Sequence, residues 1–267
     1  MRRIFEVLGV PVHAIDLPAA VTTICDLAAN GDRSGRAAYV CVRDVNGIVA
    51  SRRDARLLAV HRQAAMVTPD GMPVVWWGRL HGYRETKRVY GPDLMVETCR
   101  ASPASALKHY LCGGTEHVAE ELQHRLQTRC PAVDIVGTWT PPFHELGPDE
   151  YRALAARIES CAANVIWVGL SSPKQELFMH DLSRYLNGGV LIGVGAAFDF
   201  LSGRKPQAPR WMQRNGFEWL FRLCTEPRRL GRRYLVMNSM FLILTTQYIA
   251  GRLGQLGWHW MVGRSSR

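Results

Sequence analysis

Short apolar runs of β-strand type alternate with helical patterns along most of the chain. Six runs lie at residues 37–43, 65–68, 108–112, 133–137, 164–169 and 189–194. Helical patterns lie between them, as at 18–30, 47–63, 92–101 and 149–161. Strands that alternate with helices form parallel sheets, because each helix carries the chain back to the same edge. We therefore predict an α/β fold with a parallel, doubly wound sheet.

The basic charge of the chain is concentrated at its C-terminal end. Of the 33 Lys and Arg and 23 Asp and Glu, residues 204–267 contain 12 and 2, which leaves 21 of each in residues 1–203. A basic segment beside an apolar one favours an anionic partner: a membrane surface, a diphosphate or nucleic acid. A solvated basic tail is the alternative. We divide the chain into a catalytic body, 1–205, and a C-terminal appendage, 206–267.

The cysteines and the N-terminal residues bear on the compartment. The seven cysteines are scattered and contain no Cys-x-x-Cys pair. We therefore expect neither a disulfide framework nor a zinc site, and a reduced, cytoplasmic compartment. Glu6, His13 and Asp16 interrupt any apolar segment after Met-Arg-Arg, so we expect no secretory signal.

Two polar residues directly follow predicted strands. Asp70 precedes Gly71 after the run at 65–68, and Asn46 follows the run at 37–43. Open α/β sheets bind their ligands at the C-terminal ends of the strands, so both residues are site candidates. Each also has a structural interpretation: Asp70 as a turn residue that bonds its own backbone, and Asn46 as a helix cap.

A glycine pair, Gly113-Gly114, lies between the run at 108–112 and a helix that places Val118, Leu122 and Leu126 on one face. Glycines at such a junction let the backbone approach a phosphate at a helix N-terminus. An ordinary tight turn is the alternative.

The sequence Ser172-Pro173-Lys174-Gln175 has the pattern of a helix start. It predicts Ser172 as the N-cap, Pro173 at the first helical position and Gln175 at capping-box spacing. Lys174 does not fit this pattern, because the helix dipole disfavours a cation in the first turn. We interpret it as a sign that an anion shares the site.

Asp199 follows the last predicted strand among Phe198, Phe200 and Leu201. We expect this carboxylate to be buried and therefore to have polar partners. It is either an internal cap or a functional group.

The arginines of the C-terminal segment form a second candidate site. Arg222, Arg229 and Arg232 are 7 and 3 residues apart, which places them on one face of a continuous helix. Pro227 breaks that helix unless it begins a new one. Guanidinium groups bind phosphate oxygens in pairs, so the cluster indicates a diphosphate ligand.

Residues 234–250 contain no charge. Seventeen residues are at the short limit of a membrane span, so we favour a helix that lies in the membrane interface, with Trp258 and Trp260 as anchors. A helix packed on the body or on a second subunit is the alternative, which leaves a homo-oligomer open.

In a series of motifs the chain resembles the WecG/TagA/CpsF family of bacterial glycosyltransferases. They are Asn46, Pro69-Asp70-Gly71, Arg88 with Gly91-Pro92-Asp93-Leu94, Gly113-Gly114, Gly169 with Pro173-Lys174-Gln175-Glu176, Gly193-x-Gly195 with Phe198-Asp199, Pro209, Gly216 with Glu218-Trp219, Arg222, and Glu226-Pro227-Arg228-Arg229. The resemblance extends over nearly the whole length.

The resemblance implies a Rossmann-like body with a helical, membrane-associating appendage. It implies inverting transfer from a UDP-sugar, such as UDP-N-acetylmannosamine, its uronate or UDP-glucose, onto a polyprenyl-diphosphate-linked saccharide. The reaction would take place in cell-surface polysaccharide synthesis, with the enzyme peripheral on the cytoplasmic face of the inner membrane. Asp70 matches the proposed general base, Gln175 a substrate-site glutamine, and Arg222, Arg229 and Arg232 the appendage arginines.

One position departs from the family pattern. Asp44 stands two residues before Asn46, where family members often have Thr. We place Asp44 with Asn46 in the substrate site.

The chain contains no Asp-x-Asp, the sequence with which many sugar transferases hold a metal. We expect no metal and no cofactor, with the leaving diphosphate neutralised by Arg88, Arg222, Arg229 and Arg232. Two other functions are alternatives. A nicotinamide-dependent oxidoreductase lacks its glycine fingerprint. A nucleic-acid-binding module is disfavoured because the basic region continues into an uncharged apolar run.

Overall fold

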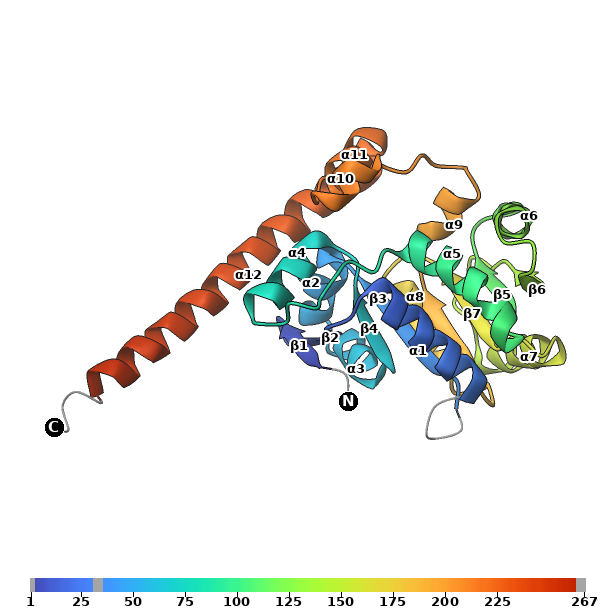
Figure 1. Cartoon of the computed structure of the whole chain (residues 1–267), viewed down its shortest axis with the longest axis horizontal. Helices are drawn as coiled ribbons and strands as arrows, with labels where there is room; N and C mark the ends of the chain where they lie inside the picture. The colour runs from blue at the N-terminus through green and yellow to red at the C-terminus, as the bar shows by residue number, and fades with distance from the viewer. Residues whose placement is uncertain (1–2, 31–35, 263–267) are drawn as a thin grey trace.

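The computed structural model describes residues 3–30 and 36–262, without the side chains of 251–262. Its centre is a six-stranded parallel sheet in the order β4-β3-β8-β7-β5-β6. The strands are β3 (Ala38–Arg43), β4 (Met66–Pro69), β5 (Lys108–Gly113), β6 (Asp134–Trp139), β7 (Val165–Gly169) and β8 (Val190–Gly193). The six predicted strands and the α/β, Rossmann-like class are confirmed (Figure 1).

Each strand sends alternate side chains to opposite faces of the sheet, and both faces are covered. Val40 and Val42 of β3 join one apolar core, and Tyr39 and Cys41 join the other. Helices α1 (Leu17–Asn30), α5 (Gly91–Ala101), α6 (Val118–Arg129) and α9 (Ala197–Leu201) pack on the first face. Helices α2 (Val45–Arg53), α3 (Ala55–Gln63), α7 (Pro148–Ser160) and α8 (Lys174–Leu182) pack on the second.

The predicted helix at 47–63 is wrong as one element, because Asp54 divides it into α2 and α3. Asp54 has an extended backbone, and its side chain accepts hydrogen bonds from the N–H groups of Arg56 and Leu57. An aspartate that caps a helix in this way begins a new one.

Several elements of the fold were not predicted. An N-terminal hairpin pairs β1 (Ile4–Val7) with β2 (Val10–His13), and α4 (Met72–Leu80) begins just after Asp70. Val74 and Trp77 of α4 join the second core together with the hairpin. A short 3₁₀ helix, η1 (Ser102–Ser105), follows α5.

The chain ends in three further helices, α10 (Arg210–Arg214), α11 (Glu218–Thr225) and α12 (Pro227–Val262), which we call the C-terminal helices. Pro227 begins α12, a position where its missing N–H costs nothing. Helix α12 has 36 residues and is therefore about 54 Å long. It crosses the body beside α2 and α4 and continues beyond it (Figure 1).

One face of α12 is buried and another is apolar but exposed. Leu230, Tyr234, Phe241 and Thr245 are buried, whereas a second set is exposed, consisting of Leu235, Val236, Leu242, Ile243, Tyr248 and Ile249. The run at 234–250 therefore packs on the body with one face. No helix within the described residues has the length and hydropathy needed to cross a bilayer. The side chains of Trp258 and Trp260 lie outside the description.

Candidate active site

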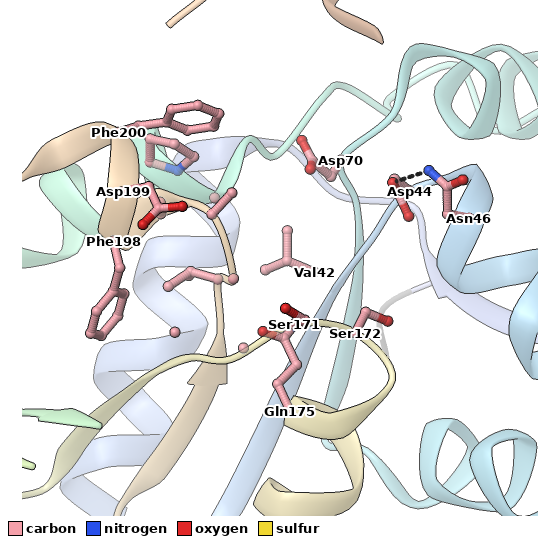
Figure 2. A pocket seen from close by; sticks show the side chains of 18 of the residues that line it. Val42, Asp44, Asn46, Asp70, Ser171, Ser172, Gln175, Phe198, Asp199 and Phe200 are labelled. Carbon is pink, nitrogen blue, oxygen red and sulfur yellow. Dashed lines mark hydrogen bonds between the residues drawn. The ribbon is translucent and has the colours of Figure 1, made fainter. Parts of the chain in front are cut away.

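A polar cavity of about 170 Å³ lies over the C-terminal ends of β4, β3, β8 and β7. Each strand leads into a loop that lines it, with Asp70 after β4, Asp44 after β3, Asp199 after β8 and Gln175 after β7. Figure 2 shows these side chains arranged around one space, with Asp199 on one side and Asp44 and Asn46 on the other. Parallel α/β sheets bind ligands at this edge.

Asp44 and Asn46 are held together on the wall of the cavity. Asp44 is the N-cap of α2, because Oδ1 accepts the N–H of Gly47 at 2.9 Å, and Asn46 Nδ2 donates to Asp44 Oδ2 at 2.7 Å. Burial tends to raise the pKa of Asp44, but these hydrogen bonds and the charges of Arg43 and Arg233 hold it below its ordinary value. The buried Oδ1 of Asn46 has no partner among the described residues, so it is free to accept a donor from a ligand.

Gln175 is oriented by a buried ion pair below the cavity. Arg43, 2% exposed, pairs with Glu176, which is fully buried. Glu176 also accepts a hydrogen bond from Gln175 Nε2 at 2.8 Å. Because a carboxylate only accepts, the amide must turn its nitrogen to Glu176, and Gln175 Oε1 is left buried without a partner in the described structure.

The predicted capping roles of Ser172 and Gln175 are wrong. Helix α8 begins at Lys174, with Pro173 at the cap position and no side-chain cap. Ser172 Oγ instead accepts from Arg43 Nη1 at 3.1 Å, and the Gln175 side chain bonds to Glu176. The buried Arg43 guanidinium outcompetes the helix end because an unpaired buried charge costs several kcal/mol.

The expected burial of Asp199 is also wrong. Its side chain is 30% exposed and pairs with Lys205 Nζ at 2.8 Å, which in turn pairs with Glu226 at 3.1 Å. The carboxylate lies at the cavity wall, at the start of α9, and Phe198 and Phe200 turn inward on either side of it.

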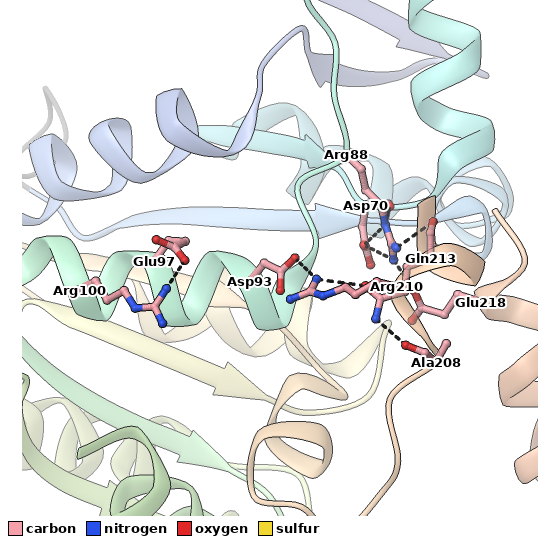
Figure 3. Close-up of polar contacts among 9 residues, drawn as sticks. All are labelled: Asp70, Arg88, Asp93, Glu97, Arg100, Ala208, Arg210, Gln213 and Glu218. Carbon is pink, nitrogen blue, oxygen red and sulfur yellow. Dashed lines mark hydrogen bonds and ion pairs between the residues drawn. The ribbon is translucent and has the colours of Figure 1, made fainter. Parts of the chain in front are cut away.

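Asp70 is connected to the C-terminal helices through Arg88 (Figure 3). Arg88 Nη2 lies 3.0 Å from Asp70 Oδ1 and 2.5 Å from Glu218 Oε2 of α11, and the guanidinium stacks on the Tyr90 ring. Burial raises the pKa of Asp70 to about 6; Arg88 opposes this, and Glu218 and Asp44 add to it. A carboxylate with such a pKa is ionised at pH 7 and is a stronger base than an ordinary aspartate.

Arginines of the C-terminal helices also line the cavity. Arg222, Arg229 and Arg233 line it. Arg229 pairs with Glu226, but the side chains of Arg222 and Arg233 form no ion pair within the described part of the chain, and Arg222 Nε is buried without a hydrogen-bond partner. Arg222 lies over the Phe200 ring. Unpaired guanidinium groups beside a cavity indicate an anionic ligand.

Arg222, Arg229 and Arg232 do not share a face of one helix, since the structure has the alternative in which Pro227 begins a new helix. Arg222 belongs to α11, and the other two belong to α12, because Pro227 starts a new helix. At about 100° per residue, Arg232 falls opposite the buried Leu230 and Tyr234, and it is exposed and outside the cavity. Arg233 lines the cavity where Arg232 was expected.

The comparison with known proteins agrees with this geometry. A family model described as "Glycosyl transferase WecG/TagA/CpsF family" matches residues 5–254. The chain belongs to this family of glycosyltransferases. A sugar donor and an acceptor are therefore its substrates, and the membership decides against the oxidoreductase and nucleic-acid-binding alternatives.

Five residues predicted for the glycosyltransferase site lie outside the cavity: Arg88, Arg232, Lys174, Gly113 and Gly114. Lys174 is exposed on α8. Gly113 and Gly114 follow β5, one strand beyond the cavity, where Gly113 packs against Gly169 so closely that a Cβ would lie 2.7 Å from its nitrogen. Gly114 packs in the same way on Val118. Their positive φ angles and these contacts explain the glycines without a ligand.

Sequence reasoning missed four residues that shape this glycosyltransferase site: Arg43, Glu218, Arg233 and Tyr234. The signal for Arg43 was present, because a charged residue closes an otherwise buried apolar strand. Glu218 stood in a family motif without an assigned role. Among the described residues, no group of three or more His, Cys, Asp or Glu side chains is placed to hold a metal ion.

Proposed function

We propose that the chain is an inverting glycosyltransferase that moves a sugar from a UDP-sugar onto a polyprenyl-diphosphate-linked saccharide in cell-surface polysaccharide synthesis. The observation that carries the proposal is the position of Asp70. This base lines one cavity together with hydrogen-bond acceptors and with arginines, of which Arg222 and Arg233 form no ion pair within the described residues. A nucleotide sugar has the complementary groups, an anionic diphosphate and a sugar rich in hydroxyl donors.

The two kinds of cavity residue suggest an orientation for the donor. The diphosphate would bind Arg222 and Arg233, with Arg229 beside them, because charge-assisted hydrogen bonds to phosphate are strong. The sugar hydroxyls would donate to the acceptors of the body, namely Asp44, Asn46, Gln175 and Asp199. Asn46 Oδ1 and Gln175 Oε1 have no hydrogen-bond partner within the described part of the chain and would gain one on binding.

In the proposed reaction Asp70 takes the proton of an acceptor hydroxyl, and the resulting oxygen attacks the anomeric carbon of the donor sugar. The new carbon–oxygen bond forms as the bond from that carbon to the diphosphate breaks on the opposite side. UDP leaves with the electron pair, and the arginines stabilise its added charge. Arg88 is already bound to two carboxylates, so we assign it to holding Asp70 instead of the diphosphate.

The exposed apolar face of α12 supports the membrane part of the proposal. Leu235, Leu242, Ile243 and Ile249 are exposed on a helix that begins in a basic segment. Such a helix fits an enzyme bound peripherally at the cytoplasmic face of the inner membrane, where anionic lipids attract basic residues.

A transfer assay tests the proposed function. The full-length protein is incubated with each UDP-sugar of a panel that includes UDP-N-acetylmannosamine, its uronate and UDP-glucose, together with polyprenyl-diphosphate-linked saccharides. We expect a product of inverted anomeric configuration and release of UDP with one donor. Release of UDP without glycosylated lipid, or a product of retained configuration, would count against the proposal.

A further inference from the structure

A second cavity, of about 560 Å³, adjoins the polar one and differs from it in character. The two cavities share Asp44, Asn46, Asp70, Glu218, Arg222 and Tyr234, so Asp70 faces both. Away from these residues the second cavity is lined by large apolar side chains: Met72, Trp76 and Leu80 from α4, Trp219 from α11, and Phe241 and Leu242 from α12. Its volume is within the range of about 300–1,000 Å³ typical of ligand pockets.

Several of these apolar side chains remain open to water. Trp76 is 50% exposed, Leu80 72% and Leu242 65%. Water-exposed tryptophan and leucine gathered around one hollow are costly to leave uncovered, and such patches mark binding sites. The hollow lies between α4 and the C-terminal helices, and Gly216 packs close to Trp76 where the two meet.

We propose that this second cavity binds the hydrocarbon chain of the lipid-linked acceptor, an inference that rests on the proposed function. The donor fills the polar cavity, so the acceptor hydroxyl must reach Asp70 from another side, and the second cavity opens onto Asp70. Its lining combines the polar residues that it shares with the first cavity and the apolar side chains of α4, α11 and α12, as an amphipathic acceptor requires.

Binding of geranylgeranyl diphosphate to the full-length protein tests this inference without relying on transfer activity. Saturating UDP fills the polar cavity, and the quenching of tryptophan fluorescence reports on the second one through Trp76, Trp77 and Trp219. We expect geranylgeranyl diphosphate to bind at least about tenfold more tightly than inorganic diphosphate, because burial of the chain adds to the affinity.

Three leucine variants test where the hydrocarbon chain binds. Leu80→Asp and Leu242→Asp each place a charge in the cavity lining and should weaken geranylgeranyl diphosphate binding about tenfold or more. Leu235→Asp is the matched control, because Leu235 lies on α12 one heptad before Leu242, is equally exposed and does not line the cavity. It should stay within about twofold of wild type.

Equal losses of geranylgeranyl diphosphate affinity in all three variants would place the hydrocarbon chain on the outer face of α12. No loss in any variant would place it elsewhere. Either result overturns the inference. So does a change from dimer to monomer on Leu242→Asp in sedimentation, which would identify a second copy as the occupant. Absence of any transfer with wild-type protein, beside normal chain binding, would overturn the proposed function instead.

Discussion

Arg88 is the residue through which the C-terminal helices act on the proposed base. Its guanidinium binds Asp70 of the body and Glu218 of α11 at the same time. Glu218 therefore competes with Asp70 for one cation and adds a second negative charge near it. Both effects keep the pKa of Asp70 raised.

The pH dependence of kcat/KM should follow this arrangement. Asp70, with its pKa of about 6, accepts a proton only when ionised, so activity should fall as the pH drops through about 6. Glu218→Gln removes one negative charge and leaves Arg88 and Asp44 as the charged groups that face Asp70. Arg88 then has Asp70 as its one carboxylate partner among the described residues. The pKa of Asp70 should then decrease, and the acid limb of the profile should move to lower pH.

Glu226→Gln is the control, because Glu226 pairs with Lys205 and Arg229 and lines neither cavity. Its acid limb should match that of wild type. An unmoved limb in Glu218→Gln would show that Asp70 is not the group that titrates.

The arginines offer a second test at single residues. Arg222→Ala and Arg233→Ala should each weaken UDP binding about 10- to 100-fold, since a hydrogen bond to a charged group contributes about 1.5–3 kcal/mol. Arg232→Ala is the control. It removes the same charge as Arg233→Ala from the adjacent residue, but Arg232 lies outside the cavity. Calorimetric titration with UDP should therefore leave Arg232→Ala close to wild type. A larger loss of UDP affinity in Arg232→Ala than in Arg233→Ala would show that Arg232 binds UDP, as predicted from the sequence.

At the scale of elements, sequence periodicity predicted the sheet well and the helix boundaries poorly. The strands are buried on both faces and so are continuous apolar runs. The hairpin was missed because its strands have only four residues each, one of which is Pro11. A new helix begins after Asp54 and another at Pro227. Residue spacings counted across either position therefore do not show which side chains share a helical face. This is why Arg233, and not Arg232, lines the cavity.

Helix α12 provides the prediction at this scale. The combined substitutions Leu235→Asp, Ile243→Asp and Ile249→Asp place charge on its exposed apolar face and outside both cavities. We expect the variant to lose binding to anionic liposomes in a sedimentation assay by about tenfold or more per side chain, while keeping its thermal stability.

The control removes the same apolar surface without adding charge, with Leu235→Gln, Ile243→Gln and Ile249→Gln. It should lose the apolar part of the binding at any salt concentration, whereas the further loss of the aspartate variant, about 1 kcal/mol per charge, should vanish at high salt. Binding of the glutamine variant equal to that of wild type at high salt would show that the apolar face does not contact lipid.

At the scale of the whole molecule, most of the carboxylates of the site and most of its arginines come from two different parts of the chain. The body contributes Asp44, Asp70 and Asp199, and the C-terminal helices contribute Arg222, Arg229 and Arg233. The strand-end carboxylates were predictable because a parallel sheet brings its strand ends together. The connection of Asp70 to Glu218 through Arg88 was not, since Arg88 and Glu218 are 130 positions apart in the chain.

This division of charge predicts transfer that does not depend on a divalent metal. Arginines that neutralise the diphosphate leave little for a metal ion to add. The initial rate should therefore be unchanged in EDTA. A loss of rate that manganese or magnesium restores would show that the arginines do not suffice.

The measurement that tests the central claim most directly is the rate of sugar transfer by Asp70→Asn beside its affinity for UDP. Asparagine keeps the shape of the side chain and removes the base, so kcat should fall about 10²- to 10⁴-fold while the Kd for UDP stays near that of wild type. A kcat within a few-fold of wild type would contradict the account and leave Asp70 as a turn residue bound by Arg88.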